Sequence, residues 1–274
     1  MDYTLAEWLA LEATDVAKIV SRRAPTAVIY LNGTRRWFLS RQQNWANYAR
    51  VTGRAQRKLS DLFFEHGLQT LIQPLLGYDL LHRGPDYLTL AVEQGLGELT
   101  SPAYRNWFAG VQARVTFYGN WQHALTEHGF AGVAAALQDV IAETAPYTRR
   151  RLLFGLFADH AAGQIVRLAQ SAGTGSDLLT RYYGQPAGPV DLVVGSGQPA
   201  IWDLPLLDVN RASLYFLQAP TFCLGQPDLR RILYDHLFER VDDDRLYDRV
   251  SDEGWDTIKI LGIGRRTDQG WIAR

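Results

Sequence analysis

Apolar residues are grouped along the chain in short continuous runs, and amphipathic stretches with a helical period separate them. Runs rich in β-branched and aromatic residues predict strands that are buried on both faces. These runs lie at residues 27–31, 70–72, 111–118, 151–157, 191–194 and 213–217. Helices are predicted at residues 4–20, 54–66, 132–143 and 163–172, the first opened by the capping box Thr4 to Glu7. The alternation predicts an α/β fold with a single open, mostly parallel β-sheet flanked by helices.

Length and composition are consistent with one hydrophobic core. The chain has 274 residues, of which 47% are apolar and 21% charged, and no repeat or long Pro/Gly/Ser-rich linker divides it. We therefore expect residues 1–274 to form a single domain. The N-terminus has no secretory signal pattern, and no window approaches the ~20 apolar residues that span a bilayer. The single cysteine, Cys223, excludes an internal disulfide and favours a reducing compartment, so a cytoplasmic protein without a transmembrane segment is expected.

The distribution of charge is more informative than its sum, which is −1 from 28 basic and 29 acidic residues. No Asp or Glu occurs between Val16 and Ser60, a stretch that carries ten cations, eight of them arginine. Arginine donates paired hydrogen bonds to phosphate, so the stretch favours a ligand with discrete phosphate groups. A solvated basic face is the structural alternative. Nucleic acid is not expected as a partner, because the chain has no zinc-finger or helix-turn-helix pattern.

The first predicted strand ends in a sequence suited to anions. Asn32 and Gly33 follow the strand, and Thr34, Arg35 and Arg36 come next. Gly33 would let backbone amides approach a phosphate, and the two arginines would add charge-assisted hydrogen bonds. Ligands of open parallel sheets bind at the carboxyl ends of strands, which in this chain also include the turns near Gly77, Gly119 and 195–197.

Residues 32–37 resemble the first motif of the cis-prenyltransferases, the undecaprenyl diphosphate synthase-like family, in which a strand precedes Asp-Gly-Asn-Gly-Arg-Trp. The match holds at Gly33, Arg36 and Trp37. Further weak matches follow in order along nearly the whole chain, at residues 67–71, 117–121, 191–197 and 214–216. Residues 164–166 stand where the family's Asn-Tyr-Gly-Gly-Arg segment leads into a helix, although those five residues are not kept. The resemblance implies the family's fold and a homodimer.

The departures from the family pattern are as informative as the matches. In chain-elongating members, an aspartate of the first motif and a late glutamate hold magnesium, and two late arginines bind the incoming isopentenyl diphosphate. The aligned positions here are Asn32, Ser213, Val194 and Ala200. The resemblance thus implies that the acceptor site is lost, while the allylic diphosphate site is kept and reinforced by Arg35, with Arg50 at a family arginine position.

The string from Gly33 to Trp37 is most similar to a branch of bacterial diterpene synthases, such as kolavelool synthases and tuberculosinyl transferases, which act on bicyclic C20 diphosphates. The implied activity is ionisation of such a prenyl diphosphate with release of diphosphate, as a terpene synthase of lyase or hydrolase type. Water capture or proton loss would then give a terpene alcohol or hydrocarbon. Mg²⁺ would be carried mainly by the substrate diphosphate, with no protein metal site and no other cofactor.

Roles can be assigned to individual residues on this hypothesis. The predicted catalytic residues are Asn32, Arg35, Arg36, Tyr48, Tyr78 and Asp79. The predicted diphosphate-binding residues are Gly33, Thr34, Arg35, Arg36 and Arg50. The predicted hydrocarbon pocket contains Trp45, Phe117 and Phe157, whose aromatic faces would stabilise an allylic cation.

Two alternative functions stay open at this point. A non-catalytic partner subunit of a heteromeric cis-prenyltransferase would also lack the first aspartate, but this chain does not have the Arg-x-Gly expected near its C-terminus. A chain-elongating enzyme is disfavoured by Val194 and Ala200. The acidic cluster 242–244 with Asp248 lacks the spacing of a magnesium motif, and Asp159 beside His160 is better explained as structural.

Overall fold

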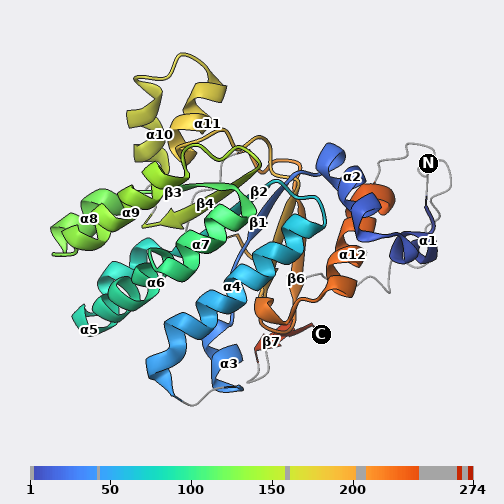
Figure 1. Ribbon diagram of the computed structural model, residues 1–274, viewed down its shortest axis with the longest axis horizontal. Coiled ribbons are helices and arrows are strands. Elements are labelled where there is room, and N and C mark those ends of the chain that lie inside the picture. The colour runs from blue at the N-terminus through green and yellow to red at the C-terminus, as the bar shows by residue number, and fades with distance from the viewer. Residues whose placement is uncertain are drawn as a thin grey trace.

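Six strands form one parallel sheet in the order β3-β4-β2-β1-β5-β6 (Figure 1). The computed structural model describes residues 3–41, 44–157, 161–201, 208–240, 264–266 and 271–273. The strands run over Thr26–Ile29 (β1), Thr70–Leu76 (β2), Ala113–Tyr118 (β3), Arg150–Leu156 (β4), Leu192–Ser196 (β5) and Ser213–Leu217 (β6). Each strand overlaps a predicted apolar run, and the predicted open sheet is confirmed, with all pairs parallel.

The order of the strands brings three carboxyl ends together. β1 lies between β2 and β5, with Ala27 opposite Leu71 on one side and Leu192 on the other. The chain moves outward from β1 through β2 and later returns to the other side of β1 through β5. Such a reversal creates a crevice at the carboxyl ends of the strands concerned.

Helices cover both faces of the sheet. The α-helices are Leu5–Ala10 (α1), Ala13–Arg23 (α2), Thr34–Leu39 (α3), Tyr48–Glu65 (α4), Pro85–Thr89 (α5), Gly97–Leu99 (α6), Pro102–Val111 (α7), Trp121–Glu127 (α8), Ala131–Thr144 (α9), Ala161–Ala169 (α10), Gly175–Tyr183 (α11) and Gln226–Tyr234 (α12). Short 3₁₀ turns span Trp45–Asn47 (η1), Tyr78–His82 (η2) and Thr221–Cys223 (η4), and π-helical segments span Leu90–Leu96 (η3) and Asp235–Glu239 (η5). Gly264–Arg266 (β7) and Trp271–Ala273 (β8) form a separate antiparallel pair.

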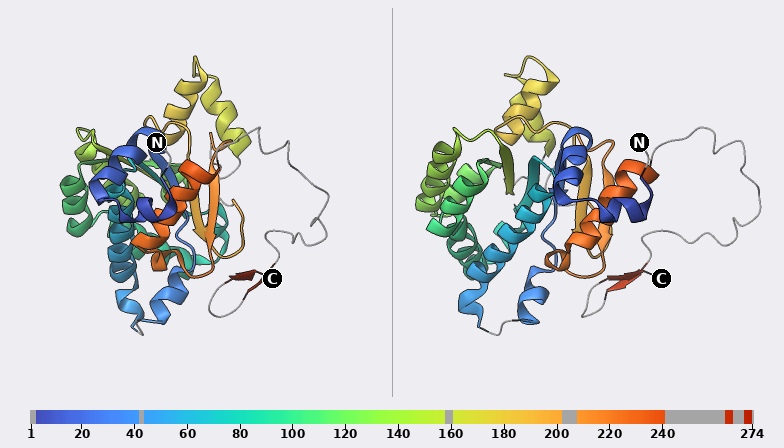
Figure 2. Two further views of the ribbon diagram at one scale, coloured as in Figure 1. Left: turned by 90° about the vertical axis from the view of Figure 1, so that its right-hand side faces the viewer. Right: turned by 45° about the vertical axis from the view of Figure 1, so that its right-hand side comes forward.

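The two faces have unequal cores. Ala27 and Ile29 face the larger one, to which α2, α4, α7, α9 and α12 contribute. Val28 and Tyr30 face the smaller one, which α11 covers. Helices α10 and α11 protrude at the top of the molecule in all three views (Figures 1 and 2).

Several boundaries differ from the predictions: Val111, predicted to begin a strand, ends α7, and the helix predicted at 163–172 is found at Ala161–Ala169. The predicted helix 4–20 is divided, because Leu11 and Glu12 are extended between α1 and α2. Its capping box is present, with the Thr4 amide donating to Glu7 Oε2 at 2.8 Å. The helix predicted from Arg54 begins earlier, at Tyr48.

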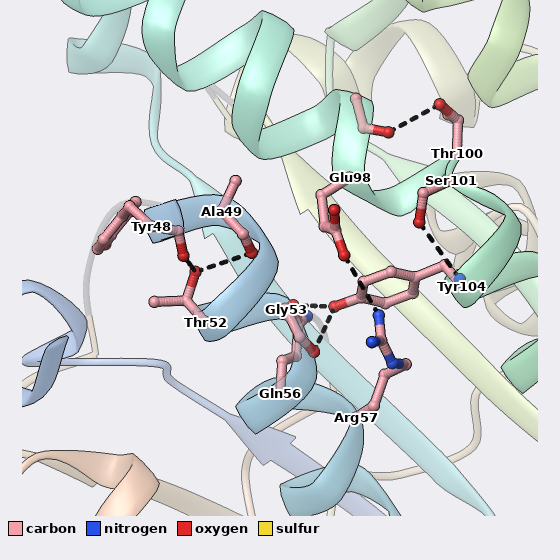
Figure 3. A network of polar contacts seen from close by, with 11 residues as sticks. Tyr48, Ala49, Thr52, Gly53, Gln56, Arg57, Glu98, Thr100, Ser101 and Tyr104 are labelled. Carbon is pink, nitrogen blue, oxygen red and sulfur yellow. Dashed lines mark hydrogen bonds and ion pairs between the residues drawn. The ribbon is translucent and has the colours of Figure 1, made fainter. Parts of the chain in front are cut away.

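A buried polar network joins α4 to β2 and α7, and Figure 3 shows its part between Gln56 and Tyr104. Gln56 Nε2 donates to Gln73 Oε1 at 2.7 Å, and Gln73 Nε2 donates to the Ser60 hydroxyl at 2.8 Å. The Tyr104 hydroxyl donates to Gln56 Oε1 at 2.7 Å, and burial raises the pKa of Tyr104. Since these buried groups have partners inside the protein, the network belongs to the fold rather than to a binding site.

Where the chain is described, no helix is long and apolar enough to cross a bilayer. The acidic cluster 242–244 with Asp248, and the pair Asp159 and His160, lie outside the described residues.

Candidate active site

A cavity of about 1070 Å³ opens where β1, β2 and β5 end. Its walls come from the segment after β1, from the start of α4, from residues 75–95 and from the turn after β5. The described lining residues are Leu31, Asn32, Gly33, Thr34, Arg35, Arg36, Trp45, Tyr48, Ala49, Leu75, Leu76, Gly77, Asp79, Leu80, Arg83, Tyr87, Leu90, Ala91, Gln94, Gly95, Ser196, Gly197 and Gln198. The strand ends expected to bind ligand after β1, β2 and β5 therefore meet here, whereas Gly119 after β3 is not in the lining.

The segment after β1 is fixed by its neighbours. The Thr221 hydroxyl donates to the Tyr30 carbonyl at 2.7 Å and accepts from the Asn32 amide at 3.2 Å. The Ser196 hydroxyl donates to the Asn32 carbonyl at 3.2 Å. Gly33 has a φ of +76°, and a Cβ on it would lie 3.0 Å from Pro220 Cβ. Glycine is required here by backbone conformation and by space.

Two predicted arginines line the cavity. Arg36 is half-buried and Arg35 is exposed. The Arg35 guanidinium carbon lies 4.9 Å from the centre of the Tyr87 ring, a cation–π contact. Within the described part of the chain, no carboxylate forms an ion pair with Arg35. Its charge is therefore available to an anion in the cavity.

The facing wall adds a third arginine, Arg83, which was not predicted from the sequence. Arg83 Nη2 lies 3.0 Å from Asp79 Oδ2, and its guanidinium carbon is 5.9 Å from the Tyr87 ring centre. Tyr87 is thus in contact with Arg35 and Arg83. The hydrogen bond from Arg83 holds the pKa of Asp79 below its usual value, so this carboxylate is ionised at neutral pH.

The cavity also has an apolar part. Trp45, Tyr48 and Phe38 pack together, with ring centres 5.0 to 5.3 Å apart. Leu80, Leu90 and Ala91 line the facing wall. The Tyr48 and Thr34 hydroxyls are 3.0 Å apart and form a polar point beside these rings.

The carboxyl end of β2 is irregular where it reaches the cavity. Pro74 has no N–H to donate, and the register to β4 shifts between Pro74 and Leu76. Such a bulge bends the strand and redirects its side chains. Leu75 and Leu76, immediately after Pro74, both line the cavity.

Four predicted site residues are not among the described lining residues. Tyr78 packs edge-on against His82, and Arg50 is exposed and donates to Asn47 Oδ1 at 2.9 Å. Phe117 is stacked on Phe154 in the larger core, with ring centres 5.7 Å apart. Phe157 is fully buried in the same core and has a φ of +49°. The cavity brings together Asn32, Gly33, Thr34, Arg35, Arg36, Trp45, Tyr48 and Asp79.

The positions aligned with other family ligands do not form a second charged site. Val194 is buried in β5. Ser213 is at the amino end of β6, whereas the cavity lies at the carboxyl ends of the strands. Ser213 shares a 2.8 Å hydrogen bond with His236 Nδ1. In the described part of the chain no three His, Cys, Asp or Glu side chains are grouped as metal ligands.

Several lining residues had a weak signal in the sequence. The wall made by α5 and η3 follows Gly84 and Pro85, a common helix start, and has apolar residues at helical spacing. Arg83 gave no signal in the sequence, because only the course of η2 brings it to the cavity.

The chain is similar to two enzymes of terpene metabolism. It is 33% identical over 246 residues to tuberculosinyl adenosine transferase of Mycobacterium tuberculosis, over 85% of this chain and 82% of that protein. It is 26% identical over 291 residues to (+)-kolavelool synthase of Herpetosiphon aurantiacus, over 98% of this chain and 94% of that protein. No protein-family model matches the chain.

Solved structures show the same fold at low identity. Lavandulyl diphosphate synthase from Lavandula x intermedia, in complex with dimethylallyl diphosphate, matches with a TM-score of 0.63 and 13% identity, covering 81% of this chain and 96% of that one. A probable undecaprenyl diphosphate synthase from Campylobacter jejuni matches with a TM-score of 0.58 and 15% identity, covering 81% and 98%.

Proposed function

The chain belongs to the family of tuberculosinyl adenosine transferase and (+)-kolavelool synthase, which has the cis-prenyltransferase fold, and we propose that it is a diterpene synthase. It ionises a bicyclic C20 prenyl diphosphate and releases diphosphate. The carbocation then captures water or loses a proton, giving a terpene alcohol or hydrocarbon. The observation that carries the proposal is that Arg35 and Arg36 line the same cavity as an apolar set of side chains that includes Trp45, Leu80 and Leu90.

The arginines act on the leaving group. When the bond between carbon and oxygen breaks, the electron pair leaves with the diphosphate, which gains negative charge. Arg35, Arg36 and Arg83 line the cavity from two different walls, so their charges would be available to the diphosphate as it leaves. Preorganised donors of this kind contribute roughly 3 kcal/mol each to a transition state.

The aromatic part of the cavity suits the cation that remains. Trp45, Tyr48 and Tyr87 present rings to the same space as the arginines. Cation–π attraction contributes on the order of 1–2 kcal/mol when the cation is desolvated. Ligand sites of this kind typically measure ~300–1,000 Å³, so the cavity suits a C20 substrate.

Polar groups in the cavity would complete the reaction by holding a water molecule and accepting a proton. The hydroxyls of Thr34 and Tyr48 can hold a water molecule that attacks the cation. The proton from that water, or from a carbon beside the cation, goes to the ionised Asp79 carboxylate or to the departing diphosphate. A carboxylate with a lowered pKa is a sufficient base, because a carbocation is a very strong acid.

Magnesium fits this site through the substrate. Among the described lining residues Asp79 is the one carboxylate, and it is paired with Arg83. Mg²⁺ prefers oxygen ligands and retains several waters, so it would take most of its ligands from the diphosphate, with the Asn32 amide oxygen as a protein ligand. Bound there it would neutralise charge on the leaving group.

A second candidate function is prenyl transfer to a neutral acceptor. The relative with 33% identity is a tuberculosinyl adenosine transferase, and Ser196 and Gln198 add uncharged polar groups to the cavity lining. Chain elongation is not favoured, because Val194 is a buried aliphatic residue that cannot bind the phosphate of a second diphosphate.

One incubation series separates these functions. Purified protein is incubated alone with geranylgeranyl diphosphate or a bicyclic C20 diphosphate, and diphosphate release and organic extracts are analysed. A terpene alcohol or hydrocarbon formed without a co-substrate supports the proposal. Turnover only with added adenosine indicates transfer, and longer chains only with isopentenyl diphosphate indicate elongation. No turnover under any condition overturns the proposal in favour of a non-catalytic subunit.

A further inference from the structure

The basic stretch between Val16 and Ser60 contains more exposed arginines than the cavity uses. Arg35 and Arg36 line the cavity, and Arg57 is paired with Glu98. Three further arginines are exposed around the end of α3 and the first turns of α4. Together with two exposed apolar residues they form a surface that we call the basic tip: Leu39, Arg41, Trp45, Arg50 and Arg54.

The basic tip combines cations with large apolar side chains. Leu39 is 52% exposed and Trp45 is 46% exposed. Monomeric proteins commonly expose single apolar residues. Here two of them lie in a stretch, residues 35–50, whose charged residues are all arginines. The acidic side chains near the cavity, Asp79, Asp86 and Glu93, belong to the facing wall instead.

The basic tip is also at one end of the molecule. α3 and the start of α4 lie at the end farthest from α10 and α11 in every view (Figures 1 and 2). Trp45 belongs to both the tip and the cavity lining, and the exposed Leu90 stands on the facing wall of the same cavity. A surface that met the tip would therefore lie next to the cavity mouth.

We propose that the basic tip docks on the surface of an anionic lipid bilayer. Arginines adjacent to a membrane are attracted by acidic headgroups, and tryptophan is favoured at the level of the headgroups. Leucine at the tip would enter the boundary with the acyl chains. A nucleic acid would satisfy the arginines but would give no role to Leu39, so a lipid surface fits the described residues better.

Docking would place the cavity mouth beside the phase in which a C20 hydrocarbon dissolves. This consequence rests on the proposed function, because only a prenyl substrate or product would gain from it. The binding itself does not depend on turnover, so the two can be tested separately.

The test is co-sedimentation of the full chain with vesicles of phosphatidylcholine alone or with ~30% phosphatidylserine. Binding is expected to the acidic vesicles, and salt at ~0.5 M should abolish it because it screens the charges. Each positive charge contributes about a five-fold change in binding. Arg54→Glu should therefore weaken binding roughly 5- to 25-fold, and Leu39→Ser should weaken it several-fold.

Matched controls exist on other faces. Arg231→Glu on α12 makes the same charge change, and Val166→Ser on α10 removes an apolar side chain that is 59% exposed. Neither should alter binding. The inference is overturned if both vesicle types are bound equally or not at all, if the controls weaken binding as much as the tip variants, or if only a DNA duplex is bound. Wild-type turnover without vesicles, measured in parallel, shows whether the proposed function holds independently.

Discussion

Two arginine-containing regions border α4, and they differ in how their charge is balanced. Arg57 lies over the Tyr104 ring at 4.4 Å, and its Nη1 is 3.5 Å from Glu98 Oε1 (Figure 3). Arg35, at the cavity, has a ring contact with Tyr87 but forms no ion pair within the described residues. The first region satisfies its polar groups internally and stabilises the fold. The second leaves positive charge facing a cavity, which suits an anionic ligand.

The largest expected effect is loss of catalysis in the second region. Arg35→Ala and Arg36→Ala should each lower kcat/KM for a C20 prenyl diphosphate by roughly 100-fold, because each removes a preorganised donor to the leaving group. The midpoint of thermal unfolding should change little. Steady-state kinetics and a thermal melt check both. Turnover within a few-fold of wild type in both variants would contradict the proposed role.

The complementary change in the first region should affect stability alone. Gln73→Leu would leave Gln56 Nε2 without its buried acceptor and would remove the donor to the Ser60 hydroxyl, at a cost of about 2–3 kcal/mol in the free energy of unfolding. Urea denaturation measures this, while kcat per folded molecule should stay near the wild-type value. A strong loss of kcat in the folded variant would show that the network and the cavity are coupled.

A smaller effect is expected on the apolar wall. Gly95 lines the cavity, and a Cβ built on it would have no atom within 4 Å outside its own helix backbone and its chain neighbours. Gly95→Leu should therefore fold normally but fill part of the cavity. Turnover of C20 diphosphates should fall about ten-fold, with a smaller fall for a C10 diphosphate.

Gly97 provides the matched control, because it has equally open surroundings and does not line the cavity. Gly97→Leu should leave the order of substrate preference unchanged. Equal losses for C10 and C20 substrates in the Gly95 variant would argue against this wall as the hydrocarbon site.

The smallest expected effect is on the pH dependence of stability, and it involves two histidines outside the cavity. Burial, together with nearby arginines, lowers the pKa of His66 and of His236. The folded state then binds fewer protons than the unfolded state, whose histidines titrate near 6.5. Their contribution to stability is complete above that pH and is lost as pH falls below it.

The urea midpoint should therefore decrease between about pH 7.5 and 5.5, and His66→Gln or His236→Gln should flatten the decrease. His123→Gln, at an exposed position, serves as the control. Asp79 should not contribute in this range, because Arg83 lowers its pKa and its linked stability is lost only at more acidic pH. An unchanged slope in both variants would contradict the assignment.

The sheet and the arginine-lined part of the cavity could be predicted from the sequence because they depend on local features. Continuous apolar runs identified the strands, and Gly33 with two arginines identified the turn after β1. The orientation of Phe117 could not be read in this way, since a strand buried on both faces does not reveal which face each side chain takes. Arg83 and Gly95 were missed because η2 and the π-helical η3 bring them to the cavity through irregular turns.

The most direct test of the account is a crystal structure with an unreactive analogue of a bicyclic C20 diphosphate. The account predicts the diphosphate within hydrogen-bonding distance of the Arg35 and Arg36 guanidinium groups, with the ring system against Trp45, Tyr48 and Gly95. A headgroup bound elsewhere, with both arginines directed to bulk solvent, would contradict it.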